Sequence, residues 1–365
     1  MFRKLLSLIA LASVSYANAQ DSTSTSTPLT ISGSVDTYYK YDFSKVQNIG
    51  TSFATDQNSV SLGMIDIALK KSTGKASFVG EVSFGPRGQA QSIPDQAVSG
   101  AFDEDGDLAA LSTSSFHIQN LYATYAFTDK FSMTAGYMGT FVGYEVISPV
   151  GNFHYSTSYL FTNGPFQNAG IKANFAPTSK VGLMVGLFNT SWNSYQADPN
   201  YGVNTFGAQL SVTPVEGWSA YFNVLTGSQS GTILDLTTAY QITDKFKLGL
   251  NAADWSAPDA DDNGYTGIAL YPSVSVTPNF GLGLRGEYFM TKKNGGALVG
   301  ATKDESITAL TFSGNLKAGG LTFIPEFRID NGSVNSFYKS REAANLGNIN
   351  TKSASQFALA VVYAF

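Results

Sequence analysis

The sequence predicts an all-β protein, a transmembrane antiparallel up-and-down β-barrel of about sixteen strands. Three observations support this fold class. Apolar residues alternate with small, polar or charged residues along many segments. The connections between these segments are alternately long and short. The chain ends in an alternating segment whose last residue is Phe365. A barrel wall needs this alternation, because one face meets lipid and the other meets water.

The first residues have the composition of a targeting segment. Arg3 and Lys4 precede the apolar stretch from Leu5 to Val14, and Ala17-Asn18-Ala19 forms a small-residue cleavage site. We therefore expect a signal peptide at 1–19, a flexible lead at 20–28 and an outer-membrane barrel at 29–365.

Sixteen strands are expected in the barrel. They are 29–43, 57–70, 74–85, 114–127, 130–145, 166–176, 180–192, 203–213, 217–229, 231–242, 245–256, 264–277, 280–291, 305–317, 320–331 and 352–365. Counts of fourteen or eighteen stay open, because 86–113 and 332–351 could each conceal strand pairing. A slip in the alternation at Met64 and Ile65 suggests a β-bulge. The strand at 114–127 has aromatic residues on both faces and cannot be oriented.

The connections are a second signal of the same architecture. Short turns such as Thr128-Asp129-Lys130 and Thr243-Asp244-Lys245 alternate with longer segments. Only Ser228–Gly231 is short where a long loop is due. Short periplasmic turns and long extracellular loops are the layout of an outer-membrane barrel.

Charged residues on the face opposite the apolar one should face water, since a cation toward lipid costs roughly 2–4 kcal/mol at mid-bilayer. Five acidic and five basic residues are predicted to line the pore: Asp36, Lys40, Glu81, Lys172, Asp235, Lys247, Arg285, Glu287, Glu326 and Arg328. Such a mixed wall favours a transverse field over strong selectivity for one ion sign. Ordinary solvated strand faces are the alternative explanation.

The composition excludes several other classes. The formal net charge is −5, which becomes −7 without Arg3 and Lys4, and an acidic chain argues against a nucleic-acid partner. There is no Cys, and no stretch of the mature chain approaches the length of a transmembrane helix.

The segment 146–165 is rich in Gly, Asn, Ser and Tyr and is the candidate constriction loop. Glu145, Asn152, His154 and Tyr155 are its candidate selectivity residues. Irregular backbone at membrane depth survives only inside a lumen, which favours a loop folded inward. The alternative is a loop that lies outside and covers the barrel.

Gly136-Tyr-Met-Gly-Thr-Phe-Val-Gly-Tyr-Glu145, Tyr155-Ser-Thr-Ser-Tyr159 and Gly164-Pro-Phe166 together resemble the OmpL-like β-barrel porins of Gram-negative bacteria. Ser32-Gly-Ser-Val-Asp-Thr-Tyr-Tyr-Lys-Tyr-Asp42 is similar to the same family. The resemblance implies an outer-membrane channel and supplies no catalytic residue. The final strand resembles the signal that the outer-membrane barrel assembly machinery reads, with Phe365 as its last residue.

The sequence offers weaker matches to two other kinds of site, a lipase-like catalytic site and a calcium site. His154 and Ser156 invite comparison with barrel lipases, but no surrounding motif supports a nucleophile and its base. The acidic segments Asp103–Asp107 and Asp259–Gly264 could bind calcium, but neither has the spacing of a twelve-residue calcium loop. No metal, cofactor or catalytic residue is therefore predicted.

The sequence thus predicts a porin that lets small hydrophilic solutes diffuse passively across the outer membrane. The alternative function is a non-conducting barrel that acts as an adhesin or structural anchor. The sequence leaves open which solute passes, how wide the pore is, and whether three copies associate as a homotrimer.

Overall fold

The structure, a computed structural model, describes residues 26–85, 116–189, 195, 197–258 and 262–365. The predicted signal peptide lies outside the described residues. Of the predicted lead, only residues 26–28 are described.

Sixteen strands are present, as predicted, and together they form nearly all of the regular structure. They are β1 Thr30–Asp42, β2 Ser59–Thr73, β3 Ala76–Phe84, β4 Phe116–Thr128, β5 Phe131–Gly139, β6 Gln167–Thr178, β7 Val181–Asn189, β8 Val203–Val212, β9 Trp218–Gly227, β10 Gly231–Gln241, β11 Phe246–Ser256, β12 Gly264–Thr277, β13 Phe280–Thr291, β14 Ser306–Ala318, β15 Leu321–Gly332 and β16 Ser353–Ala364. In the described part of the chain, three short helices lie in loops: η2 Pro149–Gly151, α2 Tyr159–Asn163 and α3 Arg341–Asn345.

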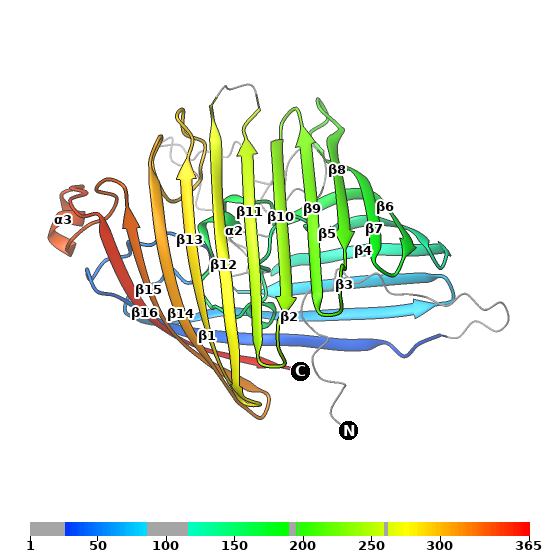
Figure 1. The fold of residues 1–365 in the computed structure, drawn as a ribbon, viewed down its shortest axis with the longest axis horizontal. Helices are drawn as coiled ribbons and strands as arrows, with labels where there is room; N and C mark the ends of the chain where they lie inside the picture. The colour runs from blue at the N-terminus through cyan, green and yellow to red at the C-terminus, as the bar shows by residue number, and fades with distance from the viewer. Residues whose placement is uncertain (1–25, 86–115, 190–194, 196, 259–261) are drawn as a thin grey trace, which may run out of the picture.

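The strands form a closed barrel in which each strand pairs antiparallel with its neighbours in sequence (Figure 1). The first and last strands close the wall, with Ser34 opposite Ala364 and Asp42 opposite Gln356. Beyond that register the Gly33 and Phe365 backbones exchange two hydrogen bonds of 3.1 and 3.0 Å. Closure leaves no unpaired edge, which a bilayer would not tolerate.

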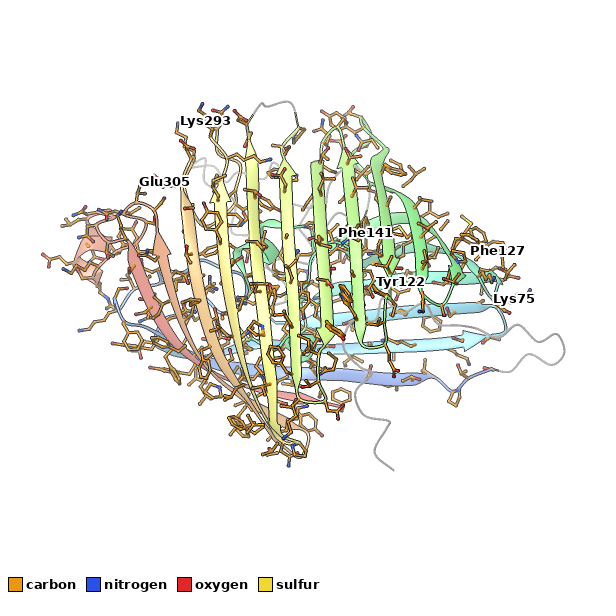
Figure 2. All side chains as sticks on the ribbon, in the orientation of Figure 1. Lys75, Tyr122, Phe127, Phe141, Lys293 and Glu305 are labelled. Atoms are coloured by element: carbon orange, nitrogen blue, oxygen red, sulfur yellow. The ribbon has the colours of Figure 1, made fainter. Side chains whose placement is uncertain are left out.

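The connections alternate as predicted, including the short turn after β9. Lys293 and Glu305 mark a long loop at one end of the barrel, and Lys75 and Phe127 mark short turns at the other (Figure 2). The segment between β15 and β16 contains α3 and no additional strand pair, while 86–113 lies outside the described residues. The strand predicted at 130–145 was too long: β5 ends at Gly139, where the chain leaves the wall.

The outer face of the wall is apolar and exposed. Val60, Leu62, Leu121 and Leu234 are 81%, 68%, 57% and 57% exposed. Aromatic pairs such as Trp218 with Tyr240 and Tyr363 with Phe365 lie near the short turns. An apolar band flanked by aromatic residues is what a barrel presents to lipid. No helix among the described residues is long and apolar enough to cross a bilayer.

The predicted bulge is present and has a partner. Gly63 and Met64 of β2 lie together opposite Asp36 of β1, and the Met64 N–H donates to the Asp36 carboxylate at 3.0 Å. A second register shift lies between β3 and β4, at Glu81 and Val82. This shift explains why the faces of the 114–127 segment could not be assigned from its pattern.

Candidate functional site

The segment 140–166, called the inner loop below, leaves the wall after β5 and returns at β6. The Thr140 N–H donates to the Phe166 carbonyl at 3.0 Å, so the two ends of the loop are adjacent. Between them Tyr155, Ser156 and Ser158 are completely buried. This burial results from contacts with the barrel wall, so the loop lies inside the barrel.

Carboxylates of the wall accept hydrogen bonds from backbone N–H groups of the inner loop. The contacts run from the Tyr155 and Ser156 nitrogens to Glu326 (2.8 and 3.1 Å), from the Tyr159 and Leu160 nitrogens to Glu287 (3.0 and 2.9 Å), and from the Gly143 nitrogen to Asp235 (3.1 Å). A buried N–H group outside a sheet or helix needs such an acceptor. These wall acids therefore fix the path of the loop backbone.

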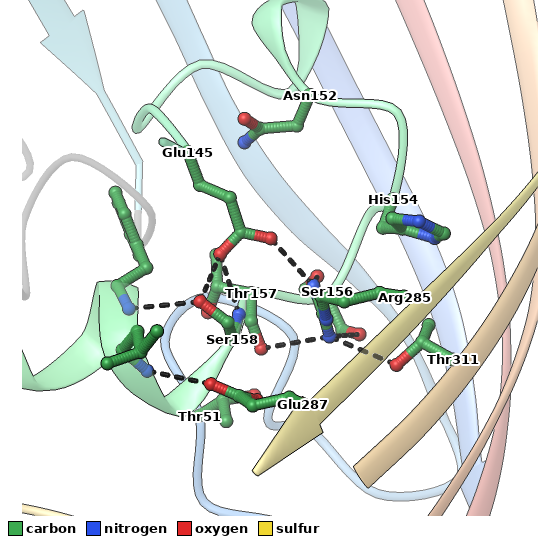
Figure 3. Close-up of polar contacts among 12 residues, drawn as sticks. Thr51, Glu145, Asn152, His154, Ser156, Thr157, Ser158, Arg285, Glu287 and Thr311 are labelled. Carbon is green, nitrogen blue, oxygen red and sulfur yellow. Dashed lines mark hydrogen bonds and ion pairs between the residues drawn. The ribbon is translucent and has the colours of Figure 1, made fainter. Parts of the chain in front are cut away.

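Two wall arginines bind the loop from the same side of the barrel. Arg285 donates to the Ser156 carbonyl at 2.6 Å and to the Thr157 carbonyl at 3.2 Å, and pairs with Glu145 of the loop at 2.7 Å (Figure 3). Arg328 donates to the Thr157 carbonyl at 2.8 Å and forms a two-pronged ion pair with Asp330 at 2.7 and 2.9 Å. Both guanidinium groups are completely buried and oriented by several partners.

Tyrosine hydroxyls of the loop bind two further wall carboxylates. Tyr155 donates to Asp36 at 2.5 Å, and Tyr159 donates to Asp330 at 2.6 Å. The carboxylate of Asp36 lies in the β1–β2 bulge described above. The bulge therefore positions an acceptor for the tip of the loop.

Wall glycines leave room for the large side chains of the loop. A Cβ atom on Gly283 would lie 2.4 Å from the Phe153 ring, and one on Gly249 would lie 2.2 Å from the Tyr144 hydroxyl. Gly207 and Gly267 accommodate Phe141 and Leu160 in the same way. Tyr144 also stacks on Tyr271 of β12, with ring centroids 4.4 Å apart. The loop is thus packed against the wall as well as hydrogen-bonded to it.

The segment between β1 and β2 also folds inward, which the sequence reasoning missed. Ser52 donates from its backbone and its hydroxyl to Thr162 of the inner loop at 3.0 and 3.1 Å. Phe53 packs on Phe161 and Phe166. The apolar residues Ile49 and Phe53 could have indicated this inward fold, because the segment was expected to lie outside the barrel in water.

The ten predicted pore-lining residues fall into two groups. Seven are buried beneath or beside the inner loop: Asp36, Lys40, Asp235, Arg285, Glu287, Glu326 and Arg328. Three remain half-buried: Glu81, Lys172 and Lys247. Glu81 lies on β3, where Asn120 donates to it at 2.7 Å, and Lys172 lies on β6. We call the inner faces of β1, β13 and β15 the covered wall, and those of β3, β4 and β6 the open wall.

The four predicted loop residues also differ in their surroundings. Glu145, His154 and Tyr155 are buried against the wall, whereas Asn152 is partly exposed. Asn152 joins the loop to itself, by hydrogen bonds of 3.0 and 2.6 Å with the backbone of Val146. Burial and the charge of Arg285 lower the pKa of His154, and its Nδ1 lies 2.7 Å from the Ser313 hydroxyl.

The hydrogen bonds do not support a lipase-like site. His154 bonds to Ser313, whereas Ser156 accepts a hydrogen bond from Arg285 at 3.3 Å, and both serines are completely buried. Of the two candidate calcium segments, 103–107 and residues 259–261 lie outside the described residues. Within the described part of the chain, no three His, Asp or Glu side chains form a group suited to a metal ion.

The same barrel architecture is found in solved outer-membrane proteins. The anion-selective porin from Comamonas acidovorans has a TM-score of 0.59 at 11% identity, with 93% of this chain and 100% of that chain covered. OprB of Pseudomonas putida has a TM-score of 0.57 at 9% identity, covering 92% and 94%. OmpT of Vibrio cholerae in a trimer form has a TM-score of 0.55 at 12% identity, covering 93% and 99%. No curated protein sequence matches the chain.

The closed sixteen-stranded wall, its apolar outer face and the loop folded inside define a porin-like barrel of the bacterial outer membrane. The chain belongs to the family described as "Putative beta-barrel porin-2, OmpL-like", whose model matches residues 28–365. The family predicted from the sequence is therefore confirmed.

Proposed function

We propose that the protein is a passive pore for small hydrophilic solutes and carries out no covalent step. The proposal is supported mainly by the contrast between the two walls. Contacts with the wall hold the inner loop on β1, β13 and β15, while the polar inner face of the open wall stays partly exposed. A sixteen-stranded barrel is wide enough to enclose an aqueous channel beside such a loop.

Recordings from planar bilayers containing the purified protein test this proposal. Stable ohmic conductance steps are expected. A silent membrane, with protein shown to be folded and inserted, would favour the non-conducting anchor or adhesin instead. Liposome-swelling rates with sugars of increasing size would then give the size limit of the pore.

Within this proposal the inner loop, including the predicted segment 146–165, is the constriction. Because the Thr140 nitrogen and the Phe166 carbonyl are 3.0 Å apart, a short glycine turn can replace residues 142–164 and leave the wall continuous. The shortened protein should conduct more than the natural one. Equal conductance would show that the loop does not limit flow.

The predicted partners belong to the same proposal. Apolar residues of the outer face would contact outer-membrane lipid, and the strand ending at Phe365 would be read by the barrel assembly machinery. A homotrimer is proposed because OmpT of Vibrio cholerae has a trimer form of similar fold. Light scattering of the detergent-solubilised protein would distinguish a monomer from a trimer.

A further inference from the structure

On the inner face of the barrel, most of the acidic residues are buried, whereas most of the charged residues that keep contact with solvent are lysines. Ten strand residues that face inward are buried, seven acids and three bases: Asp36, Lys40, Asp42, Asp66, Asp235, Arg285, Glu287, Glu326, Arg328 and Asp330. Among the described strands, the inward-facing charged residues that keep contact with solvent are four lysines and one acid: Lys70, Lys172, Lys247, Lys317 and Glu81.

The inward direction of the four lysines follows from their strand neighbours. Each side chain points to the same face as the residue two positions away. Lys247 and Lys317 share a face with Gly249 and Asn315, which contact the inner loop at Tyr144 and at the Phe153 carbonyl. Lys70 follows the buried Ala68 at the same spacing.

Lys172 is placed on the inner face by its cross-strand neighbours. It lies opposite Gly186 of β7, which in turn lies opposite Gly207 of β8. A Cβ atom on Gly207 would meet the ring of Phe141, a residue of the inner loop, so this row of residues faces the interior. Lys172 stands midway along β6, whereas Lys70, Lys247 and Lys317 lie nearer the short turns.

The acids are buried because the inner loop and the wall use them as hydrogen-bond acceptors. Glu326, Glu287 and Asp235 receive backbone N–H groups of the loop, as described above, and Ser34 donates to Asp66. These donors stabilise the carboxylates, and the buried Lys40, Arg285 and Arg328 balance three of the seven acids. Of the lysines in contact with solvent, Lys70 lies near Glu81, whereas Lys172, Lys247 and Lys317 form no ion pair with another described residue.

The inner loop adds no exposed charge of its own. Its sequence contains one carboxylate, Glu145, which is buried and paired with Arg285. The most exposed residues of its mid-portion are Val146 and Val150, at 47% and 43%. On the inner faces of the described strands, the charged side chains in contact with solvent are therefore mostly lysines.

We infer that the pathway prefers small anions, such as chloride or inorganic phosphate, over cations of similar size. This inference rests on the proposed function. It replaces the balance of five acids and five bases expected from the sequence, and it runs against the net charge of −5 of the whole chain. Fixed charges of one sign along a confined aqueous path raise the local concentration of ions of the opposite sign.

The test is the zero-current potential of the protein in planar bilayers under a gradient of dilute potassium chloride. A potential with the sign of chloride preference is expected. Replacing Lys70, Lys172, Lys247 or Lys317 by Gln should each lower the chloride-to-potassium permeability ratio by about fourfold. One unit charge roughly 10 Å away in a water-like dielectric changes the local concentration of each ion about twofold, in opposite directions for the two ions. Glu81→Gln should raise the ratio by about the same factor.

Lys71→Gln is the matched control. Lys71 is next to Lys70 on β2, but its side chain lies on the outer face of the barrel, where it is opposite Phe78. Its replacement should leave the ratio unchanged. Potassium preference in the natural protein, or a ratio unaffected by all four inner replacements, would overturn the inference while leaving a pore in place. A silent membrane would instead overturn the proposed function.

Discussion

The covered wall and the open wall are built from the same kind of strand, yet their charged residues differ in burial and in what they bind. On β1, β13 and β15, acids and arginines are fully buried and bind the backbone of the inner loop. On β3 and β6, Glu81 and Lys172 keep contact with solvent. The difference shows that an inward-facing charge in a barrel can serve to hold a loop instead of meeting a solute.

The largest expected difference between the walls comes from removing a buried guanidinium. Arg285→Met leaves the buried Glu145 with the donors of Ser158 but without its cationic partner, and it removes two hydrogen bonds to loop carbonyls. These losses should destabilise the docked loop by about 3–5 kcal/mol. Proteinase K should then cleave the segment 140–166 more than about a hundredfold faster, as mass spectrometry would show. Lys172→Met removes one charge from the open wall and should leave cleavage unchanged. Equal cleavage of the two variants would contradict the distinction between the walls.

A smaller effect is expected from removing one hydroxyl. Tyr155→Phe removes the 2.5 Å hydrogen bond to Asp36 and should destabilise the docked loop by about 1.5–3 kcal/mol, the range for hydrogen bonds to charged groups. The same cleavage assay should report an acceleration of about ten- to a hundredfold. Tyr122→Phe, on the open wall, is the control. An unchanged rate for Tyr155→Phe would mean that the hydrogen bond from Tyr155 to Asp36 does not help to hold the tip of the loop.

The smallest effect is expected where packing alone is changed. Gly283→Ala places a methyl group 2.4 Å from the Phe153 ring and should lower the free energy of unfolding by about 1–3 kcal/mol through overpacking. Gly80→Ala on β3, where a Cβ meets no atom within 4 Å, should change it by less than about 0.5 kcal/mol. Urea unfolding in detergent micelles compares the two variants. Equal losses would show that the space at Gly283 is not needed by the loop.

Much of the wall could be predicted because its pattern is local. The alternation along 280–291 and 320–331 assigns every second side chain to the same face of the wall. The bulge at Met64 appears in the sequence as a break in the alternation. The strand at 130–145 was extended too far: Gly139, Val142 and Gly143 already break the alternation, and β5 ends at Gly139.

The distribution of exposure could not be predicted, because it depends on contacts between distant residues. Tyr155 and Asp36 are 119 positions apart, and Tyr155 and Glu326 are 171 apart. No local pattern indicates that Glu326 binds loop nitrogens whereas Lys172 stays in contact with solvent. Likewise, the inward fold of 43–58 becomes evident only once Thr162 is in place to accept from Ser52.

The mutual hydrogen bonds between Gly33 and Phe365 have a consequence for biosynthesis. The cylinder closes only when β16 meets β1, a strand far away in the sequence. A chain in which β16 is not in place would leave the edges of β1 and β15 unpaired, because both strands pair with β16. Such chains would be prone to join one another edge to edge.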